Sequence, residues 1–285
     1  MRRAWGVFVA ACLGASTAWA APQRTPRPPL PLDTFEFGLY ELDRPGRIAL
    51  LRSLGYAGIV LPWPDPAKIG SYLALPAVRE GRFKVDAVLV AVKDRFPNDH
   101  FGPVLDAMAG HVPQLWMSIE GVEGVALAEG IRAIARAASA RHVTLVLYPH
   151  VDSSLPSAER TAELIRSARL DGVRLAINLV QEHKGGNRDR LPEVVRRTVA
   201  LAGAVTLNGS ETEDGLPNVD FSRTILPLDR GDFDVRKNLI EPLVLHGYRG
   251  IITLHTWNVK DAPADHLARS MDKWREMNRP VRRPR

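Results

Sequence analysis

The feature that most constrains this chain is an alternation of two hydrophobic patterns along almost its whole length. Short runs rich in β-branched and aromatic residues, typical of buried strands, are each followed by apolar residues at helical spacing. Eight such pairs follow one another, which favours a closed barrel over an open sheet of about five or six strands. The 285 residues also suit a barrel of about 250. We therefore predict an α/β fold, a single (β/α)₈ TIM barrel, over residues 34–278.

The predicted strands are short and mostly apolar: Phe35–Tyr40, Gly58–Trp63, Lys84–Val92, Gln114–Ile119, Val143–Tyr148, Val173–Leu179, Ala204–Asn208 and Gly250–His255. The helices with the clearest periodicity lie between them: Arg44–Leu54, Val125–Ser139, Ala158–Ala168, Leu191–Ala202, Val235–His246 and Ala264–Met277. Ser157 stands where a helix N-cap is expected, and Gly55 stands just past a helix end.

Residues 1–20 have the parts of a secretory signal peptide. Arg2 and Arg3 give a positive start, an apolar run extends from Trp5 to Leu13, and Ala18-Trp19-Ala20 fits a small-residue cleavage site. The run is shorter than the roughly 20 apolar residues that a spanning helix needs, so we expect removal rather than a membrane anchor. We therefore predict an exported protein, periplasmic or extracellular, with no transmembrane segment in the mature chain.

The single cysteine, Cys12, lies inside this segment, so the cleaved chain would contain no thiol and no disulfide. Residues 9–12 also loosely fit a lipoprotein processing site, and lipid anchoring through Cys12 is the alternative. A proline-rich stretch at 21–33 predicts an extended linker, and 279–285 form a basic tail.

The net charge of +6 does not indicate a nucleic-acid partner. Arg2, Arg3 and four arginines of the tail equal this excess, so the rest of the chain is neutral. Basic residues gathered at two chain ends are better explained as solvated termini than as a binding patch. Nothing in the sequence indicates a nucleotide cofactor, and the oligomeric state stays open.

Polar and aromatic residues gather at the carboxyl ends of the predicted strands. In a (β/α)₈ barrel these ends and the following loops converge on one cavity, where barrel enzymes keep their chemistry. In strand order they are Glu36, Tyr40, Trp63, Lys93, Glu120, His150, Asp152, Asn178, Glu182, His183, Asn208, Glu211 and His255. For Glu36, Lys93 and Asp152 a solvated loop position is an equal alternative.

Four ionisable residues are the strongest candidates for chemistry. His150 follows Tyr148-Pro149, so a rigid turn fixes its direction, the alternative being a structural hydrogen bond to a loop carbonyl. Glu182 and His183 are expected on the loop after the sixth strand, where either could be a general base or a metal ligand. His255 ends the eighth strand, with packing under the final helix as its alternative. His111, His142 and His246 precede strands and are expected to serve the fold.

Two asparagines complete the expected cavity. Asn178 lies between Ile177 and Leu179 in an apolar strand, so it must either line the barrel mouth or find buried partners. Asn208 precedes Gly209, where the backbone can turn sharply and leave the amide exposed to the cavity, or form a tight turn without chemistry. We expect His150, Asn178, Asn208 and His255 to converge on one cavity.

Several segments in this order resemble the sugar phosphate isomerase/epimerase group of xylose isomerase-like barrels. They are LGYAGIVL (Leu54–Leu61), LYPH (Leu147–His150), INLVQEH (Ile177–His183), TLNGSE (Thr206–Glu211), LPLDRGDFDV (Leu226–Val235) and LHGYRGIITLHTW (Leu245–Trp257). The resemblance covers nearly everything from Phe35 to Met277. It implies a sugar isomerase, epimerase or related lyase that removes a proton next to a carbonyl.

The resemblance implies roles for the residues at the strand ends. Glu182 or His183 would be the base, and His150 and His255 oxyanion donors or metal ligands. Asn178, Asn208 and Lys93 would bind substrate hydroxyls, and Trp63 and Trp257 would stack on a sugar ring. Outside the cytoplasm phosphorylated sugars are scarce, so we expect a free or oxidised sugar or a glycoside as the small-molecule carbohydrate substrate.

The chain departs from the resembling metal enzymes, which hold a divalent ion with two glutamates, an aspartate and a histidine. At the matching strand ends it has His150, Asn178, Asn208 and His255, which bind a hard cation weakly without charged oxygens. A divalent metal would then need Glu120, Glu182 or Glu211 beside His150 and His255. A non-catalytic carbohydrate-binding barrel and an endonuclease-IV-like phosphodiesterase are the two alternatives.

The first prediction concerns processing. We expect the mature protein to begin at or near Ala21, because Ala18-Trp19-Ala20 fits the cleavage site better than the region before Cys12. N-terminal sequencing or intact mass of exported protein measures this start. A mature chain that begins at a lipid-modified Cys12 would contradict it.

Overall fold

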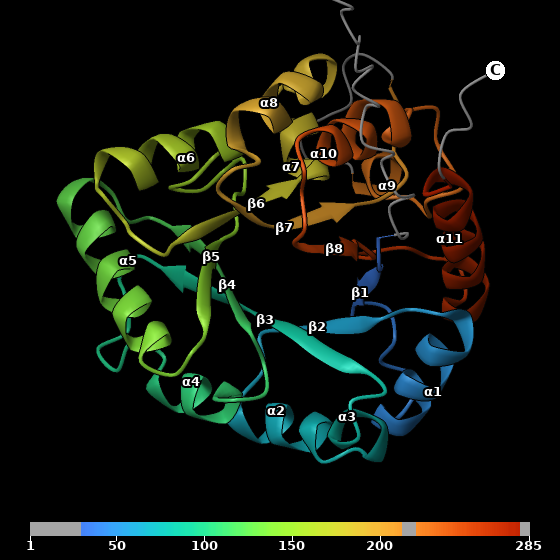
Figure 1. Cartoon of the computed structure of the whole chain (residues 1–285), viewed down its shortest axis with the longest axis horizontal. Coiled ribbons are helices and arrows are strands. Elements are labelled where there is room, and N and C mark those ends of the chain that lie inside the picture. Colours follow the sequence, from blue (N-terminus) through green and yellow to red (C-terminus); the bar gives the residue numbers. More distant parts are fainter. Residues whose placement is uncertain (1–29, 213–220, 280–285) are drawn as a thin grey trace, which may run out of the picture. The chain divides into compact units, whose positions relative to one another are not determined.

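The computed structural model describes residues 30–212 and 221–279, which include an eight-stranded parallel barrel closed between its first and last strands. The strands follow one another in chain order, and helices surround them (Figure 1). Their bounds are β1 (Asp33–Phe35), β2 (Gly58–Pro62), β3 (Lys84–Lys93), β4 (Gln114–Glu120), β5 (Thr144–Leu147), β6 (Arg174–Asn178), β7 (Ala202–Leu207) and β8 (Ile251–Leu254). The predicted (β/α)₈ barrel is confirmed. The predicted segments 1–20 and 21–29, and the end of the tail at 280–285, lie outside the described residues.

The helices that periodicity singled out are present near their expected positions. They are α1 (Arg44–Leu54), α5 (Gly124–Ser139), α6 (Ala158–Ser167), α8 (Leu191–Thr198), a π-helical turn (Arg236–Ile240) that leads into α10 (Glu241–Leu245), and α11 (Pro263–Met277). Shorter helices complete the described parts: α2 (Pro66–Leu73), α3 (Pro76–Arg79), α4 (Gly102–Met108), α7 (Leu179–Lys184), a 3₁₀ turn (Arg188–Arg190) and α9 (Phe221–Thr224). None of these described helices is long and apolar enough to cross a membrane.

The first strand differs from its prediction. β1 ends at Phe35, whereas the sequence pattern extended the strand to Tyr40. The chain turns directly after Phe35, since Leu39 N donates to the carbonyl oxygen of Glu36 and Gly38 adopts a φ of 79°. Phe37 therefore continues the inward-facing side of β1 on a turn, while Glu36 faces outward.

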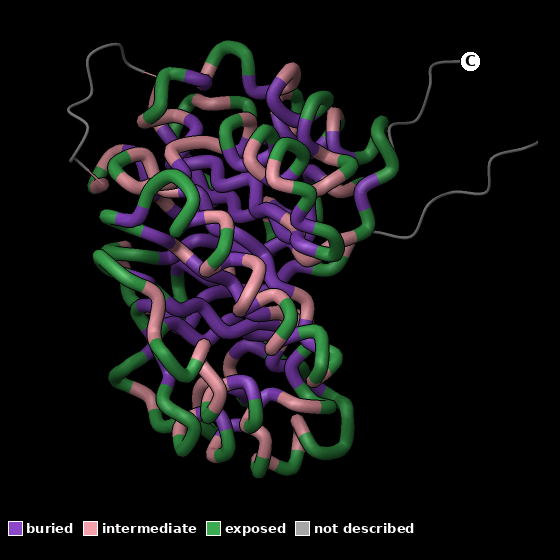
Figure 2. Tube along the Cα trace, turned by 90° about the vertical axis from the view of Figure 1, so that its left-hand side faces the viewer, coloured by how far each residue is buried: buried purple, intermediate pink, exposed green. Residues whose placement is uncertain are grey.

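The barrel interior is a packed core that extends to the floor of the cavity at its carboxyl end. Phe35, Trp116 and Tyr148 form its aromatic centre, with Trp116 and Tyr148 stacked at 5.7 Å between ring centroids. A second, larger apolar cluster joins residues of the strands and of the surrounding helices. Figure 2 shows buried segments inside the molecule and exposed segments at its surface. Truncating a buried aromatic ring of this kind costs about 3–5 kcal/mol.

Two carboxyl groups meet at the opposite, amino-terminal end of the barrel. Asp33 of β1 and Asp86 of β3 are hydrogen-bonded through their side chains, next to Gly58 of the intervening strand. A Cβ atom at Gly58 would collide with these carboxyl oxygens, so the close approach requires glycine. Burial, followed by the charge of Asp86, raises the pKa of Asp33 well above its usual value.

This pair predicts a stability that falls as the pH rises. Because the pKa of Asp33 is higher in the folded than in the unfolded chain, its contribution is full below the unfolded pKa and is lost as pH rises through the folded pKa. Asp33→Asn should remove this pH-dependent loss of unfolding free energy. The loss amounts to about 1.4 kcal/mol for each unit by which the pKa of Asp33 differs between the folded and the unfolded chain. Urea unfolding between acid and mildly alkaline pH measures it, with the exposed Asp171→Asn as control. Parallel pH profiles for wild type and Asp33→Asn would contradict it.

Candidate active site

A cavity of about 450 Å³ opens at the carboxyl ends of the strands. Its polar lining residues come from the ends of β3, β4, β6 and β8, from the loop after β5 and from helix α7. They include Lys93, Ser118, Glu120, His150, Asp152, Ser153, Asn178, Gln181 and His255. Its remaining walls are mainly apolar side chains, among them Leu89, Val92, Ile119 and Phe221. This combination of an apolar wall and a few convergent polar groups is typical of small-molecule sites.

Three aromatic side chains form one wall, which we call the aromatic corner: Phe37, Trp63 and Trp257. Phe37 lies 5.5 Å from Trp63 and 5.0 Å from Trp257, and the two tryptophan rings lie 6.0 Å apart, measured between ring centroids. Trp63 and Trp257 remain 55% and 41% exposed. Trp63 holds a left-handed backbone conformation at φ 44°, with its N–H donating to the carbonyl oxygen of Leu89 at 2.7 Å. The corner thus offers open ring faces to a ligand.

His255 lies deep in the cavity between aromatic rings. The ring of Phe35 lies 5.2 Å and that of Phe37 6.0 Å from the imidazole, between centroids. Burial, followed by the charge of His150, lowers the pKa of His255 to about 3, so the ring is neutral at physiological pH. The N–H of Trp257 approaches Nδ1 at 3.4 Å as a donor, which favours the tautomer with the proton on Nε2. His255 is then a neutral hydrogen-bond donor.

His150 stands half-buried on the loop after β5. Its N–H donates to the carbonyl oxygen of Leu155 at 3.0 Å, and its own carbonyl accepts from Ser153 Oγ at 2.6 Å. Burial and then the charge of Lys184 lower the pKa of His150, and the carboxylates of Asp152 and Glu120 oppose them. The lowered pKa favours the neutral imidazole near pH 7, the form that can accept a proton.

Asn178 is a buried amide in the wall of the cavity. It ends β6, is 1% exposed, and neither its amide oxygen nor its amide nitrogen has a hydrogen-bond partner. Leaving buried amide groups without partners costs about 1–3 kcal/mol each. Because Asn178 also lines the cavity, its amide oxygen and nitrogen can hydrogen-bond a polar molecule that enters there.

Asn208 does not line the cavity together with His150, Asn178 and His255. Its Nδ2 donates to the carbonyl oxygens of Gly209 at 2.7 Å and Thr224 at 2.6 Å, and it lies outside the cavity lining. The expectation that four strand-end residues converge is therefore met by His150, Asn178 and His255 and not by Asn208. The structural alternative, an Asn-Gly segment that anchors the following chain, describes Asn208 better.

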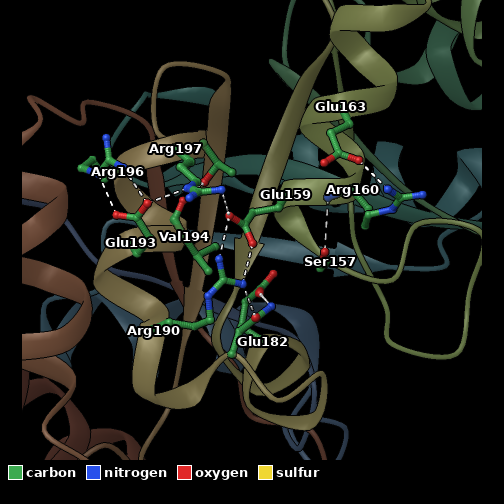
Figure 3. Close-up of polar contacts among 12 residues, drawn as sticks. Ser157, Glu159, Arg160, Glu163, Glu182, Arg190, Glu193, Val194, Arg196 and Arg197 are labelled. Carbon is green, nitrogen blue, oxygen red and sulfur yellow. Dashed lines mark hydrogen bonds and ion pairs between the residues drawn. The ribbon is translucent and has the colours of Figure 1, made fainter.

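Glu182 and His183 lie in helix α7, not on a loop, and outside the cavity lining. Glu182 Oε1 accepts from the N–H of Ala158 at 2.8 Å, and Oε2 accepts from Asn187 Nδ2 at 2.6 Å. Figure 3 shows Glu182 close to Arg190, which bridges to Glu159 between α6 and α8. Burial dominates the raised pKa of Glu182. Its carboxylate therefore caps the amino end of α6 and does not face the reaction space.

His183, like Glu182, makes structural contacts away from the cavity. Its Nδ1 lies 3.1 Å from Ser210 Oγ, and its ring packs edge-on against Phe233 at 4.3 Å between centroids. Burial lowers the pKa of His183 to about 4. Neither residue expected to be the base thus reaches the cavity, because the chain continues into a helix directly after β6 and carries both side chains away from the barrel mouth.

The remaining carboxylates take different positions. Glu36 points outward and is buried against Arg47 and Lys68, with the Tyr72 hydroxyl donating to it at 2.6 Å. Glu211 pairs with Arg223 and lies outside the cavity lining. Glu120 and Lys93 do line the cavity, where they form an exposed ion pair at 3.5 Å.

These positions decide whether the chain fits a divalent metal. Among residues 30–212 and 221–279, no three His, Cys, Asp or Glu side chains come together in a way that could hold a metal ion. The metal hypothesis required Glu120, Glu182 or Glu211. Glu182 and Glu211 are held elsewhere, and Glu120 lines the cavity but pairs with Lys93. Asn178 brings only a neutral amide. The donor set in this part of the chain does not fit a resident divalent ion.

Gln181 and Tyr148 also line the cavity and were not singled out from the sequence. Tyr148 was placed as the last residue of the fifth strand, and its inward direction follows from the alternation of that strand. Gln181 could have been found only by recognising that a helix begins at Leu179, because the helical spacing then brings residues 178 and 181 onto one side.

No protein-family model and no curated protein matches the chain. Solved structures do match it in fold. A xylose isomerase domain containing protein from Salmonella typhimurium shares 14% identity with a TM-score of 0.67, covering 86% of this chain and 96% of that one. The 3-keto-D-glucoside 4-epimerase YcjR from E. coli shares 12% identity with a TM-score of 0.67, covering 87% and 99%.

A third structure, D-psicose 3-epimerase with D-tagatose from Clostridium cellulolyticum, shares 11% identity with a TM-score of 0.64, covering 87% of this chain and 98% of that one. The chain therefore has the fold of the xylose isomerase-like TIM barrels, as its sequence motifs indicated. Identities this low establish the fold, and the reaction has to be argued from the site.

The contacts of Glu182 predict a structural role. Glu182→Ala should lower the free energy of unfolding by about 1–3 kcal/mol, because the Ala158 N–H and the Asn187 amide lose a buried acceptor. Glu163→Ala, which removes an exposed partner of Arg160 on the same helix, should cost less than about 1 kcal/mol. Chemical denaturation of both variants measures the difference. Equal stability losses would contradict the capping role.

Proposed function

We propose that this protein is a carbohydrate isomerase, epimerase or related lyase that moves a proton next to a carbonyl group without a metal ion. The observation that carries the proposal is the meeting of His150, Asn178 and His255 in one cavity beside the aromatic corner. These residues supply a neutral imidazole that can accept a proton, and neutral donors that can stabilise an oxyanion.

In the proposed reaction His150 takes the proton from the carbon next to the substrate carbonyl. The electrons of the broken C–H bond move into the carbonyl and give an enediolate, whose negative oxygen accepts hydrogen bonds from His255 Nε2 and Asn178 Nδ2. In isomerisation His150 returns the proton to the former carbonyl carbon, while the hydroxyl proton of the neighbouring carbon moves to the enediolate oxygen. In epimerisation water on the opposite face supplies the new proton, and His150 releases its own proton to solvent. In a lyase reaction a leaving group on the next carbon departs with its bonding electrons. The apolar walls favour this chemistry because they strengthen hydrogen bonds to the developing charge.

The lining of the cavity supports a neutral sugar or glycoside as substrate. Lys93 is the one lysine or arginine among the lining residues in the described part of the chain, and Glu120 pairs with it. A phosphorylated sugar would require more positive charge. The open faces of Trp63 and Trp257 suit the C–H face of a sugar ring, and the likeness in fold to epimerases of a keto-glucoside and of psicose agrees with this class.

We also propose that the protein is exported, on the basis of the signal-like segment 1–20. An exported barrel would encounter free sugars and glycosides more than sugar phosphates, which agrees with a cavity in which Lys93 is paired with Glu120. Phosphodiester hydrolysis in the manner of endonuclease IV needs a cluster of metal ligands, and the described residues assemble none.

A non-catalytic carbohydrate-binding barrel is the second candidate. The missing metal-ligand group within residues 30–212 and 221–279 favours it, since the aromatic corner and Asn178 would bind sugar equally well without turnover. The two candidates differ in one observable. Only the enzyme exchanges a substrate carbon-bound proton with solvent.

The test is deuterium incorporation from D₂O into keto-sugars and keto-glycosides, followed by NMR. His150→Ala should reduce the exchange rate about 10²- to 10⁴-fold, the usual contribution of a general base. His111→Ala, an exposed histidine before β4, is the control and should leave it unchanged. Treatment with a chelator should also leave the wild-type rate unchanged. Sugar binding without any exchange would support the binding barrel, and exchange abolished by chelation would refute the metal-free mechanism.

A further inference from the structure

The loop that carries His150 is hydrogen-bonded to helix α7 at both of its ends. Its first peptide after the histidine, the N–H of Val151, donates to Gln181 Oε1 at 3.0 Å. At the other end of the loop, where α6 begins, the N–H of Ala158 donates to Glu182 Oε1 at 2.8 Å. Two consecutive side chains of α7 therefore hold the two ends of this loop.

The middle of the same loop is held from the other side. Ser154 N–H donates to the carbonyl oxygen of Ile119 at 2.9 Å, and Ser154 Oγ accepts from the N–H of Val122 at 3.2 Å. The loop is thus bound on one side to the end of β4 and the residues that follow it, and on the other to helix α7, which follows β6. Such fixed support from neighbouring side chains holds a reacting group within the narrow range of geometry that catalysis needs.

Of these contacts, that of Gln181 lies nearest to His150 along the chain. Gln181 is 2% exposed, lines the cavity, and holds the peptide group directly after His150. Its amide orientation is fixed, because an oxygen must face the Val151 N–H. Glu182, in contrast, acts at the far end of the loop, where it caps a helix.

We infer that Gln181 is a positioning residue that sets the place of the His150 imidazole through the Val151 peptide. The inference rests on the proposed function of His150 as the base. It assigns to Gln181 a role in the proton-transfer rate and not in substrate affinity. A misplacement of about 1 Å can cost on the order of 10²-fold in rate, so one hydrogen bond at this point has a large effect.

The test uses the full chain and three variants. Gln181→Met has a similar shape and lacks the acceptor, while Gln181→Glu keeps an oxygen at the same place. Gln114→Met is the control, because Gln114 is likewise a glutamine that makes side-chain hydrogen bonds, with Trp116 and Gly203, but at the amino-terminal end of the barrel. Hydrogen exchange of the Val151 amide and the ¹H–¹³C signals of the His150 ring are measured without substrate, and kcat and KM with an exchanging sugar.

In Gln181→Met we expect faster exchange at Val151, broadened or shifted His150 signals, and a kcat about 10- to 100-fold lower with KM changed less than about 3-fold. Gln181→Glu should restore the protection of Val151, and Gln114→Met should change none of these readings. Unchanged Val151 exchange and His150 signals in Gln181→Met would overturn the inference while leaving the proposed function intact. A raised KM with unchanged kcat would also overturn it, because Gln181 would then be a substrate contact.

Failure of the proposed function gives a different pattern. If no sugar shows exchange, the amide and ring signals still report whether Gln181 holds His150 in place. If Gln181→Met alters those signals but His150→Ala leaves turnover unchanged, the loop contact is real and His150 is not the base, so the assigned rate role of Gln181 is refuted.

Discussion

The closure of the sheet between β1 and β8 is the constraint on which the rest of the molecule depends. Only two residue pairs join these strands, Asp33 with Thr253 and Thr34 with Leu254. Closure leaves the sheet without an open edge and brings eight strand ends into one ring. It also brings Phe35 of the first strand against Trp116 and Tyr148 of the fourth and fifth strand regions, so the core fills from all sides.

The sequence predicted the barrel well because eight strand and helix patterns repeat in order, and the hydrophobic period reports burial directly. It also indicated His150, His255 and Asn178, since a polar residue at a parallel strand end has few places to point. It failed for Glu182 and Asn208 because their partners are distant or backbone groups: the Ala158 N–H for one, the Thr224 carbonyl for the other. No local pattern reveals such partners. Glu36 is a different case, because the alternation between inward-facing Phe35 and Phe37 is a local pattern and by itself directs Glu36 outward to Arg47.

The cavity is organised by desolvation more than by charge. Burial is the first cause of the lowered pKa of both His150 and His255, and both rings are kept neutral by it. A neutral environment makes each hydrogen bond stronger and each missing partner more costly. The same apolar lining that stabilises the fold thus sets the chemistry that the site can perform.

The distribution of tryptophan gives the molecule an optical property. Trp63 and Trp257 are exposed at the cavity, whereas Trp116 and Trp274 are buried in the core. Two more, Trp5 and Trp19, belong to the segment that the cleavage prediction removes. Emission from the mature protein therefore has a shielded part and a part open to solvent. Trp63 and Trp257 line the cavity, whereas Trp116 and Trp274 do not. We therefore expect a molecule that enters the cavity to change mainly the solvent-exposed part of the emission.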